Sequence, residues 1–338
     1  MTDTLWIGLL LTLIAGVLAG NSMLPMKFAR RWQWENTWLV FSVVSLVVLP
    51  WALALTLVPN VWGVYARLAA SQFLVPLLFG AGWGIAQVLF GLSIARLGLA
   101  LGYAVIIGLG ALLGTLGPLL VKNRAVIGTP RGTLILSGVA VMVAGILVSA
   151  WAGQRRETAP AGSVKARTGS YPLALTMAIV CGLMAPMINY SFAFGQHIAA
   201  EAVRSGAPEA LAGYAVWPVS LFGGLIPNLA YSIYLLFRNR TWRRYQGPWL
   251  PDFGSACLMG VFWMGAMALY GVGSVYLGAL GTSVGWALFQ IFMIMTATLS
   301  GVLTGEWRSA PRTALRTLWC GLALLAVATA VIAAGNRQ

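Results

Sequence analysis

Nine long stretches of this chain carry no Asp, Glu, Lys or Arg, and they constrain its fold more than any other feature. A helix needs about 20 apolar residues to cross about 30 Å of hydrocarbon, where a charged side chain is costly. One stretch, 253–305, is long enough for two crossings with a turn at 276–278. The sequence therefore predicts an all-α integral membrane protein with ten transmembrane helices. The stretches are 4–26, 36–66, 68–95, 97–121, 132–154, 168–200, 210–237, 253–305 and 317–336.

The charged residues lie between these stretches and are mostly basic. The chain has 21 Lys and Arg against 7 Asp and Glu, and the basic residues are scattered rather than gathered in one patch, which argues against nucleic-acid binding. The odd-numbered loops between helices hold 14 basic residues, whereas the even loops and tails hold 6 and Arg316 begins a helix. Lys and Arg accumulate on the cytoplasmic side of a membrane. Both termini are therefore expected to be periplasmic, in a bacterial inner membrane.

No metal or disulfide chemistry is indicated by the cysteines. Cys181, Cys257 and Cys320 lie far apart inside apolar stretches, with no Cys-x-x-Cys spacing and no nearby histidine. The first apolar stretch follows Asp3 and no basic residue, unlike a secretory signal, so it is predicted to be a retained span. We expect no metal and no cofactor.

The sequence contains an internal repeat. Residues 80–98 align with 260–278 at a constant offset of 180, with seven identities in nineteen positions that include Trp83 and Trp263. A repeat unit of five helices is odd in number, so the second copy enters the membrane from the opposite side. Such inverted repeats are typical of transporters with a substrate site near the midplane. The predicted organisation is a first five-helix repeat over 1–152, a cytoplasmic linker over 153–170 and a second repeat over 171–338.

Groups that could perform catalysis are not found within the spans. Every acidic residue, and the single histidine His197, lies close to the end of a predicted helix. Without a mid-span carboxylate, a Ser/His/Asp set or paired acids, no catalytic centre is indicated. An embedded cationic substrate would lack a counter-charge. The chain is therefore not expected to be an enzyme, and its substrate is expected to be neutral or anionic.

Uncharged polar residues and aromatic residues do occur within the spans. Amide groups can bond to hydroxyl groups and aromatic rings can pack on the C–H faces of sugars, so together they suggest a site for a neutral monosaccharide. Inversion is expected to place Trp83 and Trp263 on opposite sides of the substrate. The alternative is that each polar group only bonds to a neighbouring helix. The predicted substrate-binding residues are Asn21, Trp83, Gln87, Asn189, Trp263, Tyr270 and Gln290.

Several short motifs resemble those of a known transporter family. Between Pro25 and Trp62 they are P-x-K, W-x-W-E-x-x-W, L-P-W and P-N-x-W, and downstream they are FGAGWGIAQVLFGLSIARLGLALG, GTLGPLL, GGLIPNL and G-E-W. In these motifs the chain resembles the L-rhamnose-proton symporter family of the drug/metabolite transporter superfamily. The resemblance implies ten helices in two inverted five-helix halves, both termini outside, and proton-coupled import of L-rhamnose or a related 6-deoxyhexose by alternating access.

Proton coupling, which the resemblance implies, needs a titrating group near a span. Glu35 and Glu306 lie at predicted cytoplasmic helix ends, and His197 and Glu201 lie four residues apart on one predicted helix face. Glu35 is favoured because it belongs to the W-x-W-E motif. The alternative is a structural role, in which His197 and Glu201 form a surface pair and Glu35 and Glu306 form salt bridges with Lys27, Arg30, Arg31 or Arg308.

These observations predict a secondary active sugar importer. Its expected partners are a small neutral sugar, protons and the lipid bilayer, with no nucleic acid and no obligatory protein partner. One alternative is an exporter or facilitator of the same superfamily for amino acids or other small metabolites, because one fold serves both directions. A second alternative is a static, membrane-anchored interaction protein.

Overall fold

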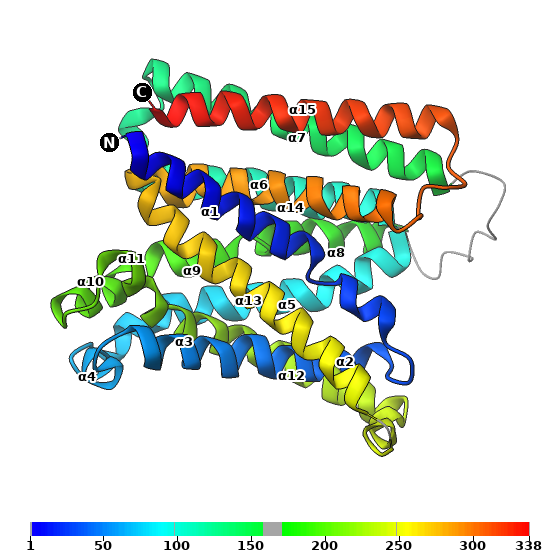
Figure 1. Ribbon diagram of the computed structural model, residues 1–338, viewed down its shortest axis with the longest axis horizontal. Coiled ribbons are helices and arrows are strands. Elements are labelled where there is room, and N and C mark those ends of the chain that lie inside the picture. Colours follow the sequence, from blue (N-terminus) through cyan, green and yellow to red (C-terminus); the bar gives the residue numbers. More distant parts are fainter. Residues whose placement is uncertain (1, 98, 158–170, 248, 338) are drawn as a thin grey trace.

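Ten apolar helical segments form the fold. The computed structural model describes residues 2–97, 99–157, 171–247 and 249–337, and within them ten segments are long and apolar enough to cross a membrane. The predicted all-helical fold with ten spans is thereby confirmed (Figure 1). Spans 1 to 10 are Leu5–Phe28, Trp34–Leu57, Ala70–Ile94, Leu101–Lys122, Pro130–Arg156, Tyr171–Arg204, Glu209–Arg238, Leu250–Tyr276, Gly278–Leu303 and Arg312–Arg337.

A sharp turn separates spans 8 and 9. The preceding helix ends at Tyr276, and Gly278 has a left-handed φ of 78°, which a glycine adopts without steric cost. The predicted turn at 276–278 is therefore confirmed.

The α-helices are α1 Thr2–Asn21, α2 Trp34–Val43, α3 Leu49–Leu57, α4 Val61–Ala66, α5 Ala70–Leu97, α6 Leu99–Lys122, α7 Pro130–Glu157, α8 Tyr171–Met184, α9 Met187–Phe194, α10 Gln196–Arg204, α11 Glu209–Ala212, α12 Trp217–Arg238, α13 Leu250–Tyr276, α14 Gly281–Leu303 and α15 Arg312–Arg337. The short turns η1 to η6 are Leu24–Phe28, Val44–Val48, Arg124–Val126, Gly213–Ala215, Thr241–Tyr245 and Gly278–Leu280.

Spans 2 and 6 are interrupted helices. In span 2 the π-helical turn η2 separates α2 from α3, just before Pro50. In span 6 the break between α8 and α9 falls at Pro186. Proline has no N–H and clashes with the carbonyl four residues earlier, so it breaks the regular helical bonding. Interrupted helices free backbone groups and are common at transporter binding sites.

The helices pack in pairs that join distant parts of the sequence. α7 and α15 lie side by side along one edge (Figure 1), α5 packs on α12, and α1 packs on both α13 and α14. α8 contacts α5 and α6, α6 contacts α14, and α2 contacts α12 and α13. Each of these pairs joins a helix from 1–152 with a helix from 171–338.

The two ends of the bundle carry different segments. The start of α1 and the end of α15 lie at one end, with α4, α10 and α11 (Figure 1). Here the Arg337 guanidinium stacks over the Trp6 ring, 4.5 Å from its centroid. We call this the terminus end. The end of α7 and the start of α8 lie at the other end, which we call the linker end (Figure 1); most of the predicted linker 153–170 lies outside the described residues.

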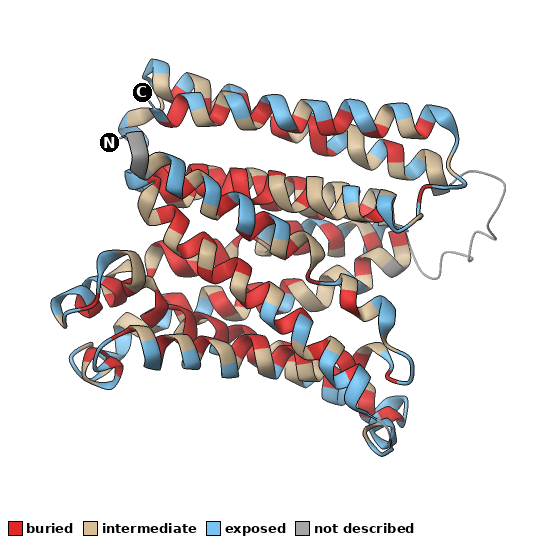
Figure 2. Ribbon diagram, viewed as in Figure 1, coloured by how far each residue is buried: buried red, intermediate tan, exposed pale blue. Residues whose placement is uncertain are grey.

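The outward surfaces of the helices are apolar. Leu10, Leu78 and Ile226 are large apolar side chains that remain largely exposed. Buried residues follow the inner sides of the helices (Figure 2). Water would make such an outer surface costly, whereas hydrocarbon solvates it. The surface therefore suits a protein embedded in a bilayer.

Candidate functional site

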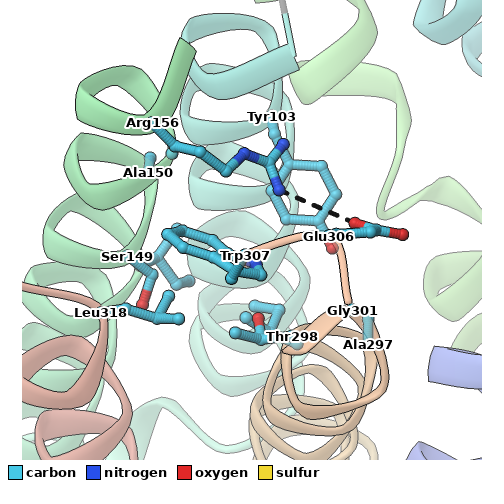
Figure 3. Close-up of a pocket in the computed structure, with 13 residues that line it drawn as sticks. Tyr103, Ser149, Ala150, Arg156, Ala297, Thr298, Gly301, Glu306, Trp307 and Leu318 are labelled. Atoms are coloured by element: carbon cyan, nitrogen blue, oxygen red, sulfur yellow. Dashed lines mark ion pairs between the residues drawn. The ribbon is translucent and has the colours of Figure 1, made fainter. Parts of the chain in front are cut away.

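Two cavities lie at opposite ends of the bundle. The linker-end cavity, of about 180 Å³, lies among α6, α7, α14 and α15, and its lining includes Tyr103, Thr298 and Trp307 (Figure 3). The terminus-end cavity, of about 380 Å³, is lined by α9, α10, α11 and α13, and its lining includes Phe192 and Gln196. The smaller volume is about six times that of a water molecule in the liquid. Each cavity is therefore large enough for a small solute.

Five buried aromatic rings lie between the two cavities. Phe192 stacks on Trp217 with ring centroids 4.7 Å apart, and it also contacts Tyr270. Tyr270 packs edge-on against Trp286 at 5.6 Å, and Trp286 contacts Phe289. Phe192 faces the terminus-end cavity, whereas later turns of α14 line the linker-end cavity. We call these five rings the aromatic septum.

The two tryptophans that the predicted repeat pairs contact each other directly. Trp83 on α5 and Trp263 on α13 stack with ring centroids 5.1 Å apart and planes 25° apart. Trp263 also packs edge-on against Phe41, which contacts Trp38. The Trp38 Nε1–H donates to Asn228 Oδ1 at 2.8 Å. In this conformation no solute fits between the stacked rings, so they join α5 to α13 instead of standing on opposite sides of a substrate.

Both the amide nitrogen and the amide oxygen of Asn189 form hydrogen bonds to other helices. Its Nδ2 donates to Gly114 O on α6 and to Thr282 O on α14, both at 2.9 Å. Its Oδ1 accepts a hydrogen bond from the Tyr270 hydroxyl. Pro118 accounts for the first bond, because a proline leaves the carbonyl four residues earlier without its helical donor. The geometry of Asn189 and Tyr270 thus matches the alternative, interhelical role of the predicted polar residues.

His197 caps a second carbonyl of the same kind. Pro76 lies inside α5 and frees the carbonyl of Gln72. His197 Nε2 lies 2.6 Å from that oxygen, and since a carbonyl only accepts, this nitrogen carries the proton. Among the described contacts, none joins His197 to Glu201. The imidazole therefore serves here as a backbone cap.

Asn21 joins the end of α1 to α14. Its Oδ1 accepts from Ser300 Oγ at 2.6 Å, and its Nδ2 donates to Val17 O at 3.0 Å. The donor and the acceptor of this amide are therefore both bonded to protein atoms.

Gln87 and Gln290 differ from the other predicted amides. Within the described part of the chain, neither side-chain amide has a hydrogen-bond partner. Gln290 is nevertheless only 5% exposed, and Gln87 is half-buried. The amide atoms of Gln87 and Gln290 are not among the described side-chain atoms that are both fully buried and unpartnered. Both amides are therefore accessible and can donate to and accept from a solute.

Both glutamines lie on helix faces that run from the protein centre toward the linker-end cavity. Residues 286, 290 and 294 share one face of α14; Trp286 belongs to the septum and Ile294 lines the cavity. On α5, Gln87 shares a face with Phe90, whose ring centroid lies 6.4 Å from that of the cavity residue Tyr103. Gln290 thus lies between a septum residue and a cavity residue on α14, and Gln87 lies near a ring that contacts the cavity residue Tyr103.

Glu35 is buried at the start of α2. Its Oε1 accepts hydrogen bonds from Thr241 Oγ1 at 2.6 Å and Asn239 Nδ2 at 3.0 Å. These bonds tie α2 to the turn that follows α12. The described residues offer Glu35 no salt bridge, which the alternative for this acid expected, and Glu35 lines neither cavity.

Two other acids each bind two cations, at opposite ends of the bundle. Glu306, just after α14, pairs with Lys27 of η1 and lies 3.7 Å from Arg156 of α7. Glu201 on α10 pairs with Arg67 at 2.6 Å and with Arg204 at 2.9 Å. The salt bridge considered for Glu306 is therefore present. We call these groups the linker-end cluster (Lys27, Arg156, Glu306) and the terminus-end cluster (Arg67, Glu201, Arg204).

One buried acid was not among the predicted site residues. Asp252, at the start of α13, is 1% exposed and accepts from the backbone N–H groups of Arg30, Arg31 and Trp32 at 2.7, 3.0 and 3.2 Å. Successive N–H groups form a small anion-binding nest, so Asp252 fixes the α1–α2 connection to α13. An acid beside a proline at a predicted helix start was the only signal in the sequence. In the described ranges no three His, Cys, Asp or Glu side chains gather in a way that could hold a metal ion.

Comparison with known proteins relates the whole chain to one family. The family model for L-rhamnose-proton symport protein (RhaT) matches residues 1–337. An L-rhamnose-proton symporter of Cronobacter sakazakii is 26% identical over 343 residues, and one of Escherichia coli is 26% identical over 348 residues; each alignment covers 99% of both chains. These are transport proteins, so the predicted family and the prediction that the chain is not an enzyme are confirmed. The chain belongs to the L-rhamnose-proton symport protein family.

Proposed function

We propose that this protein imports L-rhamnose or a related 6-deoxyhexose, together with protons, across the bacterial inner membrane. The relatives that bear the name L-rhamnose-proton symporter align with it from end to end. A neutral sugar also suits a protein in which no described carboxylate lies in the middle of a span.

The observation that best supports a sugar substrate is the pair of free amides. Gln87 and Gln290 lack protein partners, whereas the amides of Asn21 and Asn189 are bonded to other helices. An amide can donate to one sugar hydroxyl and accept from another. Trp83 lies one helical turn before Gln87 and Trp286 one turn before Gln290, so each amide shares its helix face with an aromatic ring that could pack on the methyl group of a 6-deoxyhexose.

The proposed mechanism is alternating access between two inverted halves. In the predicted repeat, spans 1 to 5 correspond to spans 6 to 10. The contacts of α1 (span 1) with α13 (span 8) and α14 (span 9) then correspond to contacts of α8 (span 6) with α5 (span 3) and α6 (span 4). Both of these contacts occur. The pairs α7–α15 (spans 5 and 10) and α6–α14 (spans 4 and 9) each join two corresponding spans, so the repeat leaves these contacts unchanged. This agreement supports two related halves, 1–152 and 171–338, joined by the linker 153–170 as in the drug/metabolite transporter fold. Rocking of such halves exposes a central site to each side in turn.

The proposed orientation has both termini in the periplasm. It rests on the excess of Lys and Arg in the loops of the linker end. In this orientation the linker-end cavity faces the cytoplasm and the terminus-end cavity faces the periplasm.

Proton coupling is proposed to use one of four groups near the span ends. These are Glu35, Glu306, Glu201 and His197. The Glu35 carboxylate accepts hydrogen bonds from Thr241 and Asn239 and lines neither cavity, and His197 donates to the Gln72 carbonyl. Glu306 lines the linker-end cavity and its side chain is 40% exposed, so water can bring a proton to it. Glu306 is therefore a better-placed candidate than Glu35.

Purified protein in detergent is expected to be stabilised by L-rhamnose and not by amino acids. A ligand that binds only the folded state adds about 2.7 kcal/mol of stability at 100 times its Kd. The melting temperature should therefore rise with L-rhamnose concentration. L-Mannose, which has a hydroxymethyl group in place of the methyl group, should raise it less. A rise with amino acids and none with any sugar would favour the exporter alternative.

A further inference from the structure

The linker-end cluster joins three separate elements at the border of a cavity. Glu306 follows α14, Lys27 belongs to η1 after α1, and Arg156 lies in the last turn of α7. Arg156 also lies over the Trp307 ring, 4.8 Å from its centroid. Figure 3 shows the Arg156–Glu306 ion pair beside Tyr103 and Trp307, all of which line the linker-end cavity. The cluster thus binds the ends of spans 1, 5 and 9 together where this cavity lies.

The terminus-end cluster likewise holds one carboxylate between two cations, at the opposite end. Arg67 follows α4, whereas Glu201 and Arg204 lie on α10. Arg67 also donates to Ser205 Oγ, which strengthens its attachment to the end of span 6. Arg204 lines the terminus-end cavity. In both clusters a carboxylate from 171–338 is held by a cation from 1–152.

We propose that the two clusters are the alternating gates of the transporter. This inference rests on the alternating-access mechanism proposed above. When the halves rock, their contacts separate at one end and stay closed at the other, so an ion pair between the halves breaks only at the end that opens. Both clusters are formed in this structure, and the aromatic septum lies between them. The structure therefore corresponds to a state with both gates closed.

The expected strength of the clusters suits a gate. The Lys27 and Glu306 side chains are 47% and 40% exposed, and an exposed ion pair shifts an equilibrium by a factor of about five or less. A stronger bond would hold one conformation permanently, whereas a factor of this size biases two states that interconvert. The Glu201 side chain is only 8% exposed. Its partners Arg67 and Arg204 are 51% and 71% exposed, so the terminus-end gate is expected to be of similar strength.

The test measures how fast a water-soluble thiol reagent reaches each cavity. Cys181, Cys257 and Cys320 are replaced by serine, and a single reporter is added: Thr298→Cys for the linker-end cavity or Ala199→Cys for the terminus-end cavity. Glu306→Gln should speed labelling of the linker-end reporter about five-fold and slow labelling of the terminus-end reporter. Glu201→Gln should do the reverse, with a change of similar size. The protein is used in detergent, so both ends meet the reagent.

Matched variants separate gating from local loosening. Lys27→Gln and Arg156→Gln should change labelling in the same direction as Glu306→Gln, because each removes a partner of the same carboxylate. Glu209→Gln is the control, since Glu209 is exposed beside the terminus-end cavity and has no ion pair among the described residues. It should alter neither rate. Melting temperatures identify any variant that has lost its fold, in which case the two cation variants decide the result for the linker end.

Opposite changes at the two reporters support the proposal. Equal acceleration of both reporters by either variant, or no change at either, would overturn it. The measurement uses no sugar and no proton gradient. A protein that fails to bind L-rhamnose but shows the opposite changes would therefore refute the proposed substrate and leave the gates in place.

Discussion

Replacing Gln290 with alanine is expected to weaken L-rhamnose binding about 10- to 100-fold without breaking a hydrogen bond in the free protein. Gln290 is 5% exposed as a residue and its amide has no partner among the described residues, so its removal breaks no hydrogen bond within the protein. It would leave a sugar hydroxyl unpaired in the bound state, at a cost of about 1–3 kcal/mol. Titration calorimetry of the purified protein measures the loss.

Gln87→Ala should likewise weaken binding without breaking a hydrogen bond in the free protein, and Gln246 provides a matched control. Gln246 is an exposed glutamine just after η5, remote from both cavities. Gln246→Ala should bind L-rhamnose as the unaltered protein does. If Gln87→Ala and Gln290→Ala also retain the original affinity, the free amides do not hold the sugar and the proposed site is wrong.

Asn189→Ala is expected to have the opposite effect, with a large loss of stability. The substitution removes three buried hydrogen bonds and leaves the Gly114 and Thr282 carbonyls and the Tyr270 hydroxyl without this partner. Each unsatisfied group costs about 1–3 kcal/mol in a protein interior and somewhat less within membranes. We expect a total loss of about 2–5 kcal/mol. Chemical unfolding in mixed detergent micelles measures it.

A second substitution tests the explanation based on Pro118. Pro118→Ala restores an N–H that can bond to the Gly114 carbonyl within α6. In the Asn189→Ala background it should recover part of the lost stability, because that carbonyl no longer depends on Asn189. Simple addition of the two single effects would show that the freed carbonyl is not what Asn189 satisfies.

The spans were predictable from sequence because hydrocarbon excludes charge. Charge-free stretches locate all ten, and the turn at 276–278 was recognisable from its glycine. Helix ends were less certain: the stretch 36–66 predicts one long span, whereas span 2 ends at Leu57. The chain turns at Asn60, which has a φ of 47° and caps α4 through a bond from the Gly63 N–H at 3.1 Å. An apolar stretch does not reveal such a turn, because it continues in apolar residues.

The candidate site was predictable only as a set of polar residues. Sequence does not distinguish Asn189, which is fully bonded, from Gln290, which is free, because the difference depends on helices far apart in the chain. Part of the answer was nevertheless present. Pro76 and Pro118 each free a carbonyl four residues earlier, and His197 and Asn189 satisfy these carbonyls. The preference for Glu35 rested on a motif, and the motif did not show that its carboxylate is held by Thr241 and Asn239.

Uptake of radiolabelled L-rhamnose into proteoliposomes tests the central claim most directly. The purified protein is reconstituted, the external sugar concentration is fixed, and the internal concentration is followed with and without an imposed gradient that is acidic outside. Proton symport predicts faster entry and accumulation above the external concentration when the gradient is present, and accumulation should disappear when a protonophore collapses the gradient. Entry that stops at the external concentration, at the same rate with and without the gradient, would contradict proton symport and make the protein a facilitator.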